Sequence, residues 1–272
     1  MQQKIESLSN AVQNYSRQVH GQIEFYGKVV DESNQSIEGA NIEFVWAHIW
    51  PLAEGTSSTN TISDSEGLFS LAGVVGANLG VQVSKNGYYN VRSLNNEEFN
   101  YSSLPGMTPF QPDPNNPVIF HLRKKGVGAD LISATLNVKV PRDGTPVYVD
   151  FLNQKFGADG QMQTSQIKPP YESWKQATMW SFKMEIPSGG FIGQNDEFPF
   201  EAPESGYQRT AEFDFKTGQT DWKTYFTTNY YFSFGNPPRY GRLTVETDIS
   251  WGGARITYVV NPTGSRNLEP AQ

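Results

Sequence analysis

Hydrophobic and polar residues alternate in short runs along the first half of the chain, and residues that favour turns separate the runs. A period of two places successive side chains on opposite faces of an extended chain, so the pattern predicts β-strands that each bury one face. We interpret 54–60 as a polar loop, 73–80 as a glycine-rich loop and 95–117 as a long irregular segment. The predicted strands lie at 23–30, 37–46, 61–63, 68–71, 81–84 and 118–122.

The second half repeats this strand-rich pattern, and no helix longer than a turn or two is evident. Its predicted strands lie at 136–140, 147–151, 178–186, 211–215, 224–234, 240–247 and 254–260. Several short strands with regular turn signals predict a sandwich or a jelly roll. We therefore expect an all-β chain with two β-sandwich domains, at 21–125 and 126–264, followed by a polar tail at 265–272.

Residues 1–20 carry a different pattern, in which apolar residues recur at spacings of three and four. This period predicts one short amphipathic helix ahead of the first sandwich. The helix could lie on the β domain, form a stalk below it, or self-associate as a coiled coil, although its two heptads are fewer than the three or four that indicate one. Its apolar positions are Ile5, Leu8, Val12, Tyr15 and Val19.

Three ordered blocks of the first domain resemble the carboxypeptidase regulatory-like family, over about residues 22–124. The blocks contain Gly27, Val29, Asp31, Ile37, Gly39, Ala40 and Ile42, then Ser63, Asp64, Gly67, Phe69 and Leu71, then Val81, Val83, Gly87 and Tyr88. The resemblance implies a seven-stranded, transthyretin-like and immunoglobulin-like sandwich that serves as a non-catalytic accessory or spacer module in exported bacterial proteins. The second half resembles only uncharacterised exported bacterial proteins, which implies no function.

The chain carries 28 acidic and 21 basic residues, a net charge of −7, and no cysteine. An acidic chain lacks the basic surface that binds phosphates, so we expect no nucleic-acid partner. No apolar run approaches the roughly 20 residues of a membrane helix, so we expect no membrane span. No signal peptide is visible. From the resemblance we expect an extracytoplasmic location, in the periplasm, at the cell surface or secreted, with any export signal upstream of residue 1.

The sequence contains no recognisable catalytic motif. Its three histidines are His20, His48 and His121, and none has a Glu three residues later, as the zinc carboxypeptidase pattern requires. Neither His-Glu-x-x-His nor Gly-x-Ser-x-Gly occurs. We therefore expect no catalytic residue, no metal site and no cofactor.

A pair of carboxylates is the one catalytic arrangement that the motifs leave open, because a glycosidase needs only two positioned acids. Glu197, Glu201 and Glu204 lie in the proline-rich segment 196–207 beside two phenylalanines, where a cleft could hold such a pair. The alternative is a solvated loop that is anchored by its aromatic residues.

Aromatic residues of the second half carry the remaining signal for ligand binding. In the predicted strand 224–234, Tyr225, Asn229 and Tyr231 share a mixed polar and aromatic face opposite a phenylalanine-rich one. Together with Trp222 and Trp251 they are the candidate ligand-binding residues, because exposed Trp and Tyr rings can stack on sugars. A partly covered outer face is the alternative interpretation.

These observations favour a non-catalytic exported protein that binds or scaffolds at the bacterial cell surface or in the periplasm. Its expected partner is a glycan or another cell-surface protein. The first alternative is a carbohydrate-binding protein that uses the aromatic residues of the second domain. The second alternative is a polysaccharide-acting hydrolase with a carboxylate pair.

Overall fold

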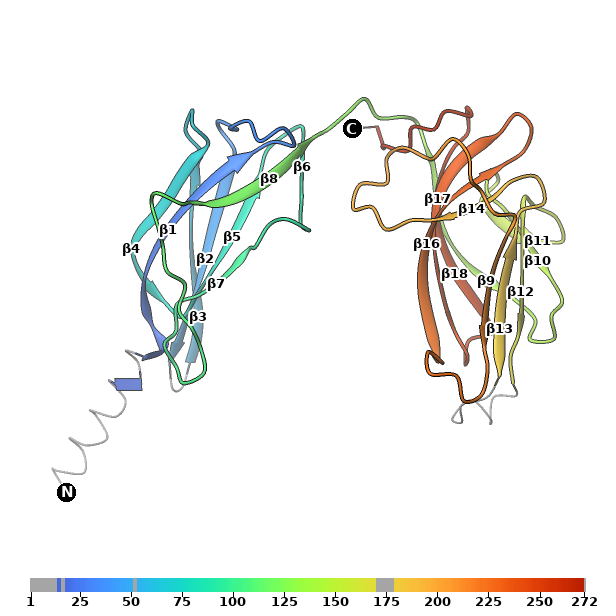
Figure 1. Cartoon of the computed structure of the whole chain (residues 1–272), viewed down its shortest axis with the longest axis horizontal. Coiled ribbons are helices and arrows are strands. Elements are labelled where there is room, and N and C mark those ends of the chain that lie inside the picture. Colours follow the sequence, from blue (N-terminus) through green and yellow to red (C-terminus); the bar gives the residue numbers. More distant parts are fainter. Residues whose placement is uncertain (1–13, 16–17, 51–52, 170–178, 272) are drawn as a thin grey trace, which may run out of the picture. The chain divides into compact units, whose positions relative to one another are not determined.

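The structure, a computed structural model, describes residues 14–15, 18–50, 53–169 and 179–271. These residues form eighteen strands in four sheets, which confirms the predicted all-β class and its sandwich architecture (Figure 1). The predicted N-terminal helix, residues 1–20, lies largely outside the described residues. The chain divides into two compact units, Met1–Lys125 and Gly126–Gln272, which are called unit 1 and unit 2 below.

Unit 1 contains two four-stranded sheets. One has the order β4-β1-β8-β6, built from β1 (Gly21–Val30), β4 (Leu68–Gly76), β6 (Tyr88–Asn90) and β8 (Val118–Lys124). The other has the order β3-β2-β5-β7, built from β2 (Asn41–Trp50), β3 (Ala53–Ile62), β5 (Asn78–Ser84) and β7 (Glu98–Asn100). The pairing of β1 with β8 is parallel and the other pairings are antiparallel. The family resemblance implied seven strands, and the described residues of unit 1 form eight, of which β6 and β7 are three residues long.

Inward-facing side chains of both sheets form the core of unit 1. Phe25 lies at its centre, and the rings of Phe44, Phe69, Phe99 and Phe120 lie within 4.7–6.2 Å of it, centroid to centroid. Such aromatic pairs contribute attraction beyond the area that they bury. The alternating burial of β1 therefore follows directly from the alternation in its sequence.

Several residues of the resemblance blocks build turns. The Asp31 carboxylate accepts hydrogen bonds from the backbone N–H groups of Ser33 and Gln35, and Asp64 does the same for Glu66 and Leu68. These are Asx-type turns, in which a short acidic side chain replaces a backbone acceptor.

Two loop predictions in unit 1 were wrong, and the segment 95–117 that was expected to be irregular contains the short strand β7. Segment 54–60 belongs to the edge strand β3, whose Ser and Thr side chains are mostly exposed, so it shows no apolar alternation. Segment 73–80 contains the end of β4 and the start of β5. Gly76 permits a close approach, because a Cβ there would lie 3.0 Å from the Ala47 carbonyl oxygen.

Unit 2 contains two five-stranded sheets. The first has the order β11-β10-β12-β13-β15, from β10 (Val147–Asp150), β11 (Lys155–Gly157), β12 (Met162–Ile167), β13 (Trp180–Glu185) and β15 (Thr210–Phe215). The second has the order β14-β16-β17-β18-β9, from β9 (Ile132–Lys139), β14 (Gly190–Gly193), β16 (Tyr225–Phe234), β17 (Arg239–Asp248) and β18 (Gly253–Asn261). All of their pairings are antiparallel.

The core of unit 2 lies between these sheets. The side chains that β12 contributes to it explain why the sequence pattern did not predict this strand. The buried face of β12 carries Met162, Thr164 and Gln166, two of which are polar. An apolar alternation is therefore absent from a strand that is nevertheless central to its sheet.

The C-terminal segment is polar in sequence but packs as part of unit 2. Leu268 is fully buried in a small cluster with Ala202, Tyr231 and Tyr240. The segment also runs beside the start of the unit, where Ala129 and Pro270 form a parallel bridge.

Candidate functional site: the Trp251 turn

The connection between β17 and β18 presents Trp251 at the surface of unit 2, with 44% of its area exposed. The turn closes through hydrogen bonds from Trp251 N to Asp248 O and from Ser250 N to the Asp248 carboxylate. Two cationic side chains hold it from the interior. Arg142 donates to Ser250 O at 2.6 Å, and Lys168 donates to Asp248 O at 2.6 Å and to Trp251 O at 3.1 Å. Trp251 is therefore carried by a turn whose backbone is fixed on both sides.

Lys168 is a buried lysine. Its Nζ lies 5.4 Å from the ring centroid of Trp180 and donates a third hydrogen bond to Thr247 Oγ1 at 3.0 Å. Burial, together with the nearby Arg142 charge, lowers the pKa of Lys168 to about 7, although Asp248 opposes the shift. The amine that anchors the turn therefore changes its charge near neutral pH.

A pocket of about 470 Å³ lies beside Trp251. Its polar lining comes from Asn137 and Lys139 on β9 and from Arg255 on β18. Arg255 donates to Asn137 Oδ1 at 3.3 Å and lies 3.7 Å from a carboxylate oxygen of Glu246. One exposed aromatic ring with donors and acceptors beside it can stack on a flat ligand face and hydrogen-bond to its edge.

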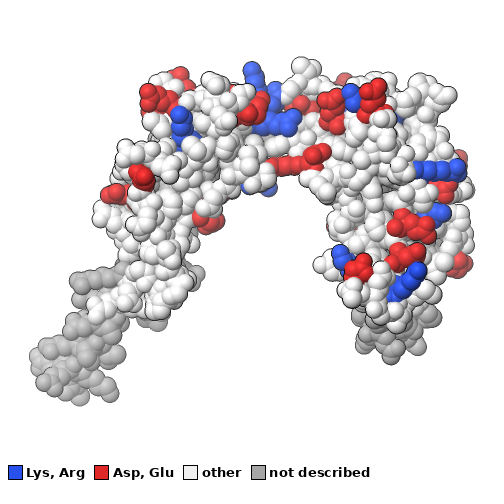
Figure 2. Space-filling model, in the orientation of Figure 1, with Lys and Arg blue, Asp and Glu red and all other residues white. Residues whose placement is uncertain are grey.

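On the face that Figure 2 shows, acidic and basic side chains of unit 2 are interspersed. The local excess of cations at the pocket, Lys139 and Arg255 against Glu246, is therefore a feature of that site.

The structure places three of the five predicted binding residues at one end of unit 2. Tyr225, 66% exposed, is the first residue of β16 and pairs with Asp248, three residues before Trp251. Trp222 lies just upstream, but it packs against the core of the unit. Asn229 is exposed in the middle of β16, where its Oδ1 accepts a hydrogen bond from Thr244 Oγ1 at 2.7 Å.

The expectation that Tyr231 lies on an open face does not fit its position. Tyr231 is on the predicted side of β16 but is only 5% exposed, and its hydroxyl donates to Asp196 Oδ2 at 2.8 Å. Burial, with the Asp196 carboxylate beside it, raises the pKa of Tyr231 above its usual range. Segment 196–207 and the C-terminal segment cover this end of the strand, and neither cover is visible in the local pattern of β16.

Segment 196–207, which was considered for a carboxylate pair, has a structural role in this cover. Glu201 forms an ion pair with Arg266 at 2.9 Å, and Ala202 N donates to Arg266 O at 2.9 Å. Glu204 is exposed to solvent. Glu201 therefore attaches the loop to the C-terminal segment, whereas Asp196 attaches it to β16.

Sequence reasoning found Trp251 but missed the groups around it. Lys168 and Arg142 lie about 80 to 110 residues before the turn in the sequence, so no local spacing predicts that they contact it. Within the described residues, no group of three or more His, Asp or Glu side chains is arranged to hold a metal ion. Among the same residues, no helix has the length and apolar character that a membrane crossing requires.

No protein-family model matches the chain, and no curated protein matches it. Among solved structures it is similar to a streptococcal ancillary pilin, with 11% identity and a TM-score of 0.25, over 79% of this chain and 53% of the pilin. It is also similar to the major pilin SpaD from Corynebacterium diphtheriae, with 9% identity and a TM-score of 0.24, over 82% and 65% of the two chains.

A third similar structure is fervidolysin from Fervidobacterium pennivorans, a keratinolytic enzyme related to subtilisin, with 11% identity, a TM-score of 0.17 and coverage of 92% and 32%. The chain thus spans 53% and 65% of the lengths of the two pilins. At these identities and TM-scores, the likenesses carry no argument about function.

Proposed function

We propose that this chain is a non-catalytic exported protein that binds or scaffolds at the bacterial cell surface or in the periplasm. The observation that carries the proposal is the tandem of two sandwich units, each of which has its own complete core. Such units act as rigid spacers that carry binding surfaces on their sheets and turns. The motif blocks of unit 1 support a non-catalytic role, because their Asp31 and Asp64 side chains build turns of the fold. We also propose that unit 1 is a carboxypeptidase regulatory-like module.

Fractionation and turnover assays test this function. In the organism that encodes the chain, a tagged protein is expected in extracytoplasmic fractions. The purified protein is expected to release neither reducing ends from polysaccharides nor fragments from peptides. Recovery in the cytoplasm alone, or turnover that a single point substitution abolishes, would overturn the proposal.

A second candidate function is glycan binding at the Trp251 turn. It is favoured by the exposed indole above a pocket lined by Asn137, Lys139 and Arg255, on a turn whose backbone is already fixed. A preformed site loses little conformational entropy on binding. Because two cations face one nearby carboxylate, this site favours saccharides that carry carboxylate or sulfate groups.

Affinity electrophoresis in gels that contain an acidic polysaccharide tests this second function. We expect retardation of the wild-type chain, loss of retardation for Trp251→Ala, and weaker retardation for Lys139→Gln. Tyr148→Ala, on the other sheet of unit 2, is the matched aromatic control and keeps wild-type retardation. Equal mobility of Trp251→Ala and wild type in the presence of the polysaccharide contradicts the assignment.

A further inference from the structure

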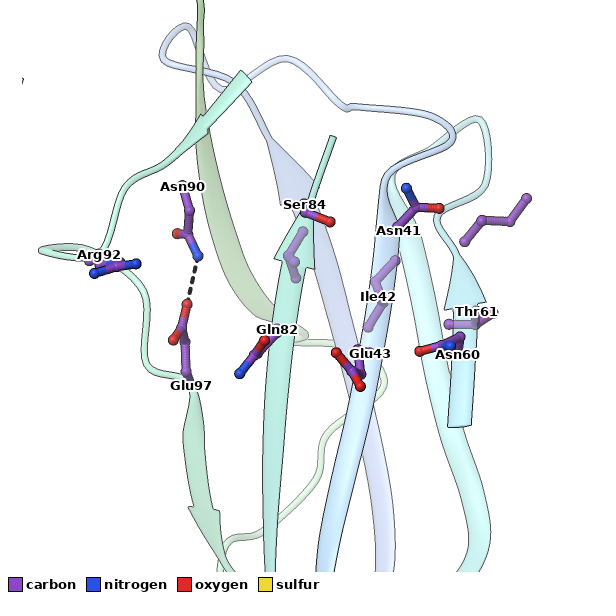
Figure 3. Close-up of a pocket in the computed structure, with 12 residues that line it drawn as sticks. Asn41, Ile42, Glu43, Asn60, Thr61, Gln82, Ser84, Asn90, Arg92 and Glu97 are labelled. Carbon is purple, nitrogen blue, oxygen red and sulfur yellow. Dashed lines mark hydrogen bonds between the residues drawn. The ribbon is translucent and has the colours of Figure 1, made fainter. Parts of the chain in front are cut away.

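The outer face of the sheet β3-β2-β5-β7 in unit 1 forms the floor of a groove of about 720 Å³ (Figure 3). Glu43 on β2 pairs with Asn60 on β3 and with Gln82 on β5, so the three side chains form one cross-strand row. Neighbouring strands lie about 4.8 Å apart. The row therefore places a carboxylate between two amides across roughly 10 Å of floor.

A second row runs beside the first, two residues along each strand. It consists of Asn41, paired with Ile62 on one side and with Ser84 on the other. Rows two residues apart are separated by about 7 Å. The floor is thus a two-row array in which five of six side chains carry hydrogen-bonding groups.

The end of β6 and its connection to β7 form one wall of the groove through Asn90, Arg92 and Glu97 (Figure 3). Asn90 donates to Glu97 Oε1 at 2.6 Å. Asn95 braces this wall against β8, because it donates to Asn90 Oδ1 at 2.6 Å and accepts from His121 N at 2.7 Å. The wall is therefore held in place by paired amides.

The floor side chains are available to a ligand. Within the described residues, the side chains of Glu43, Asn60 and Gln82 make no hydrogen bond or ion pair, and all three are exposed. An amide side chain both donates and accepts hydrogen bonds, and a carboxylate accepts them at two oxygens. Hydroxyl groups also donate and accept, so a row of amides and carboxylates can hydrogen-bond to a row of adjacent hydroxyls.

The groove chemistry disfavours other classes of ligand. Two carboxylates, Glu43 and Glu97, face one cation, Arg92, so the site repels phosphates and acidic sugars. A peptide that adds as a strand needs a free sheet edge, and one that docks by side chains needs apolar pockets. This floor is a sheet face, and Ile62 is the one apolar side chain in its two rows.

We propose that this unit 1 groove binds an uncharged oligosaccharide, whose hydroxyls hydrogen-bond to the Asn60–Glu43–Gln82 row and to the wall. The volume falls in the range of small-molecule sites, roughly 300–1,000 Å³, which holds a few sugar rings. The site is separate from the Trp251 turn of unit 2 and does not depend on the function proposed for that turn.

The test uses the full chain on an array of neutral and acidic glycans, followed by titration calorimetry with the best neutral oligosaccharide. The floor variant is Asn60→Ala with Gln82→Ala. Its matched control is Gln22→Ala with Ser70→Ala, two exposed positions on the opposite sheet of the same unit. Trp251→Ala reports on the other site. Thermal unfolding of every variant is measured in parallel.

We expect neutral glycans to bind, the floor variant to lose about tenfold or more in affinity, and both the control and Trp251→Ala to bind as wild type does. Unfolding temperatures are expected to be unchanged, because the replaced side chains are exposed. The proposal is overturned if no neutral glycan on the array binds, if the floor variant binds like wild type, or if only Trp251→Ala weakens binding of the neutral ligand.

Discussion

The ring of Phe69 lies directly over Gly27, its cross-strand partner on β1. A Cβ atom at Gly27 would come within 2.2 Å of Cζ of that ring. Unit 2 contains the same relationship, where Phe232 covers its partner Gly241 and the corresponding distance is 2.4 Å. In each unit, a glycine in a central strand thus makes room for an aromatic ring of the neighbouring strand.

We expect Gly27→Ala to destabilise unit 1 by about 1–3 kcal/mol, because the added methyl group must displace a packed ring. Gly241→Ala is expected to do the same in unit 2. The controls are Gly55→Ala and Gly157→Ala, strand glycines with no atom within 4 Å of an added Cβ. Chemical denaturation followed by fluorescence measures the effect. Equal midpoints for Gly27→Ala and Gly55→Ala would contradict the steric argument.

Lys168 makes the stability of unit 2 depend on pH. The unfolded lysine holds its proton up to about pH 10, whereas the folded one releases it near pH 7. Between these values the unfolded state binds more protons, so the free energy of unfolding rises as the pH rises. We expect this rise between about pH 7 and 9.5, and we expect Lys168→Met to lack it. Denaturant titrations at several pH values measure it, and a wild-type profile that is no steeper than that of Lys168→Met over this window shows that the folded amine keeps its proton.

Two tryptophans of unit 2 are expected to differ in how much stability their truncation costs. Trp222→Ala removes a ring that packs against the core, so it should lower stability by about 2–4 kcal/mol. Trp251→Ala removes a half-exposed ring and should change stability by less than about 1 kcal/mol. Thermal denaturation separates the two. A larger loss for Trp251→Ala would mean that its ring supports the turn.

The cover over Tyr231 depends on Leu268. Leu268→Ala empties part of the cluster that also contains Ala202 and Tyr240, and we expect a loss of about 2–3 kcal/mol. Hydrogen exchange should then increase in 196–207 and in 265–271. Glu201→Gln breaks only the exposed ion pair with Arg266, so it should cost less than about 1 kcal/mol. Exchange that rises equally in both variants argues against Leu268 as the anchor.

The sequence predicted strands where one face is apolar and the other polar. In β16 the alternation even assigned the correct faces, with Phe226 and Phe232 inward and Tyr225 outward. It missed the short strands β6, β7, β11 and β14. It also failed at β12 and β3, because the buried face of the first is largely polar and the second is a hydroxyl-rich edge. An apolar alternation marks a strand only where the buried positions are apolar, and in β12 the regularly alternating buried positions are largely polar.

The candidate sites were less predictable than the strands because contacts between distant segments create them. Trp251 was predicted as a binding residue because it is aromatic, but the hydrogen bonds from Lys168 and Arg142 that hold its turn form only in the folded unit. Tyr231 was predicted to bind ligand on the same grounds, but 196–207 and the C-terminal segment cover it. The groove of unit 1 could not be read from sequence, since Asn60, Glu43 and Gln82 become a row only through strand register.

The parallel bridge between Ala129 and Pro270 has a mechanical consequence. Hydrogen bonds from Ala129 N to Glu269 O and from Ala271 N to Ala129 O join the first and last segments of unit 2, and Gly126 N and the Asn267 amide add two more. Tension between residues 126 and 271 would pull two parallel segments in opposite directions. These four bonds would then be loaded together in shear, and they would have to break before the pull reached the sheets.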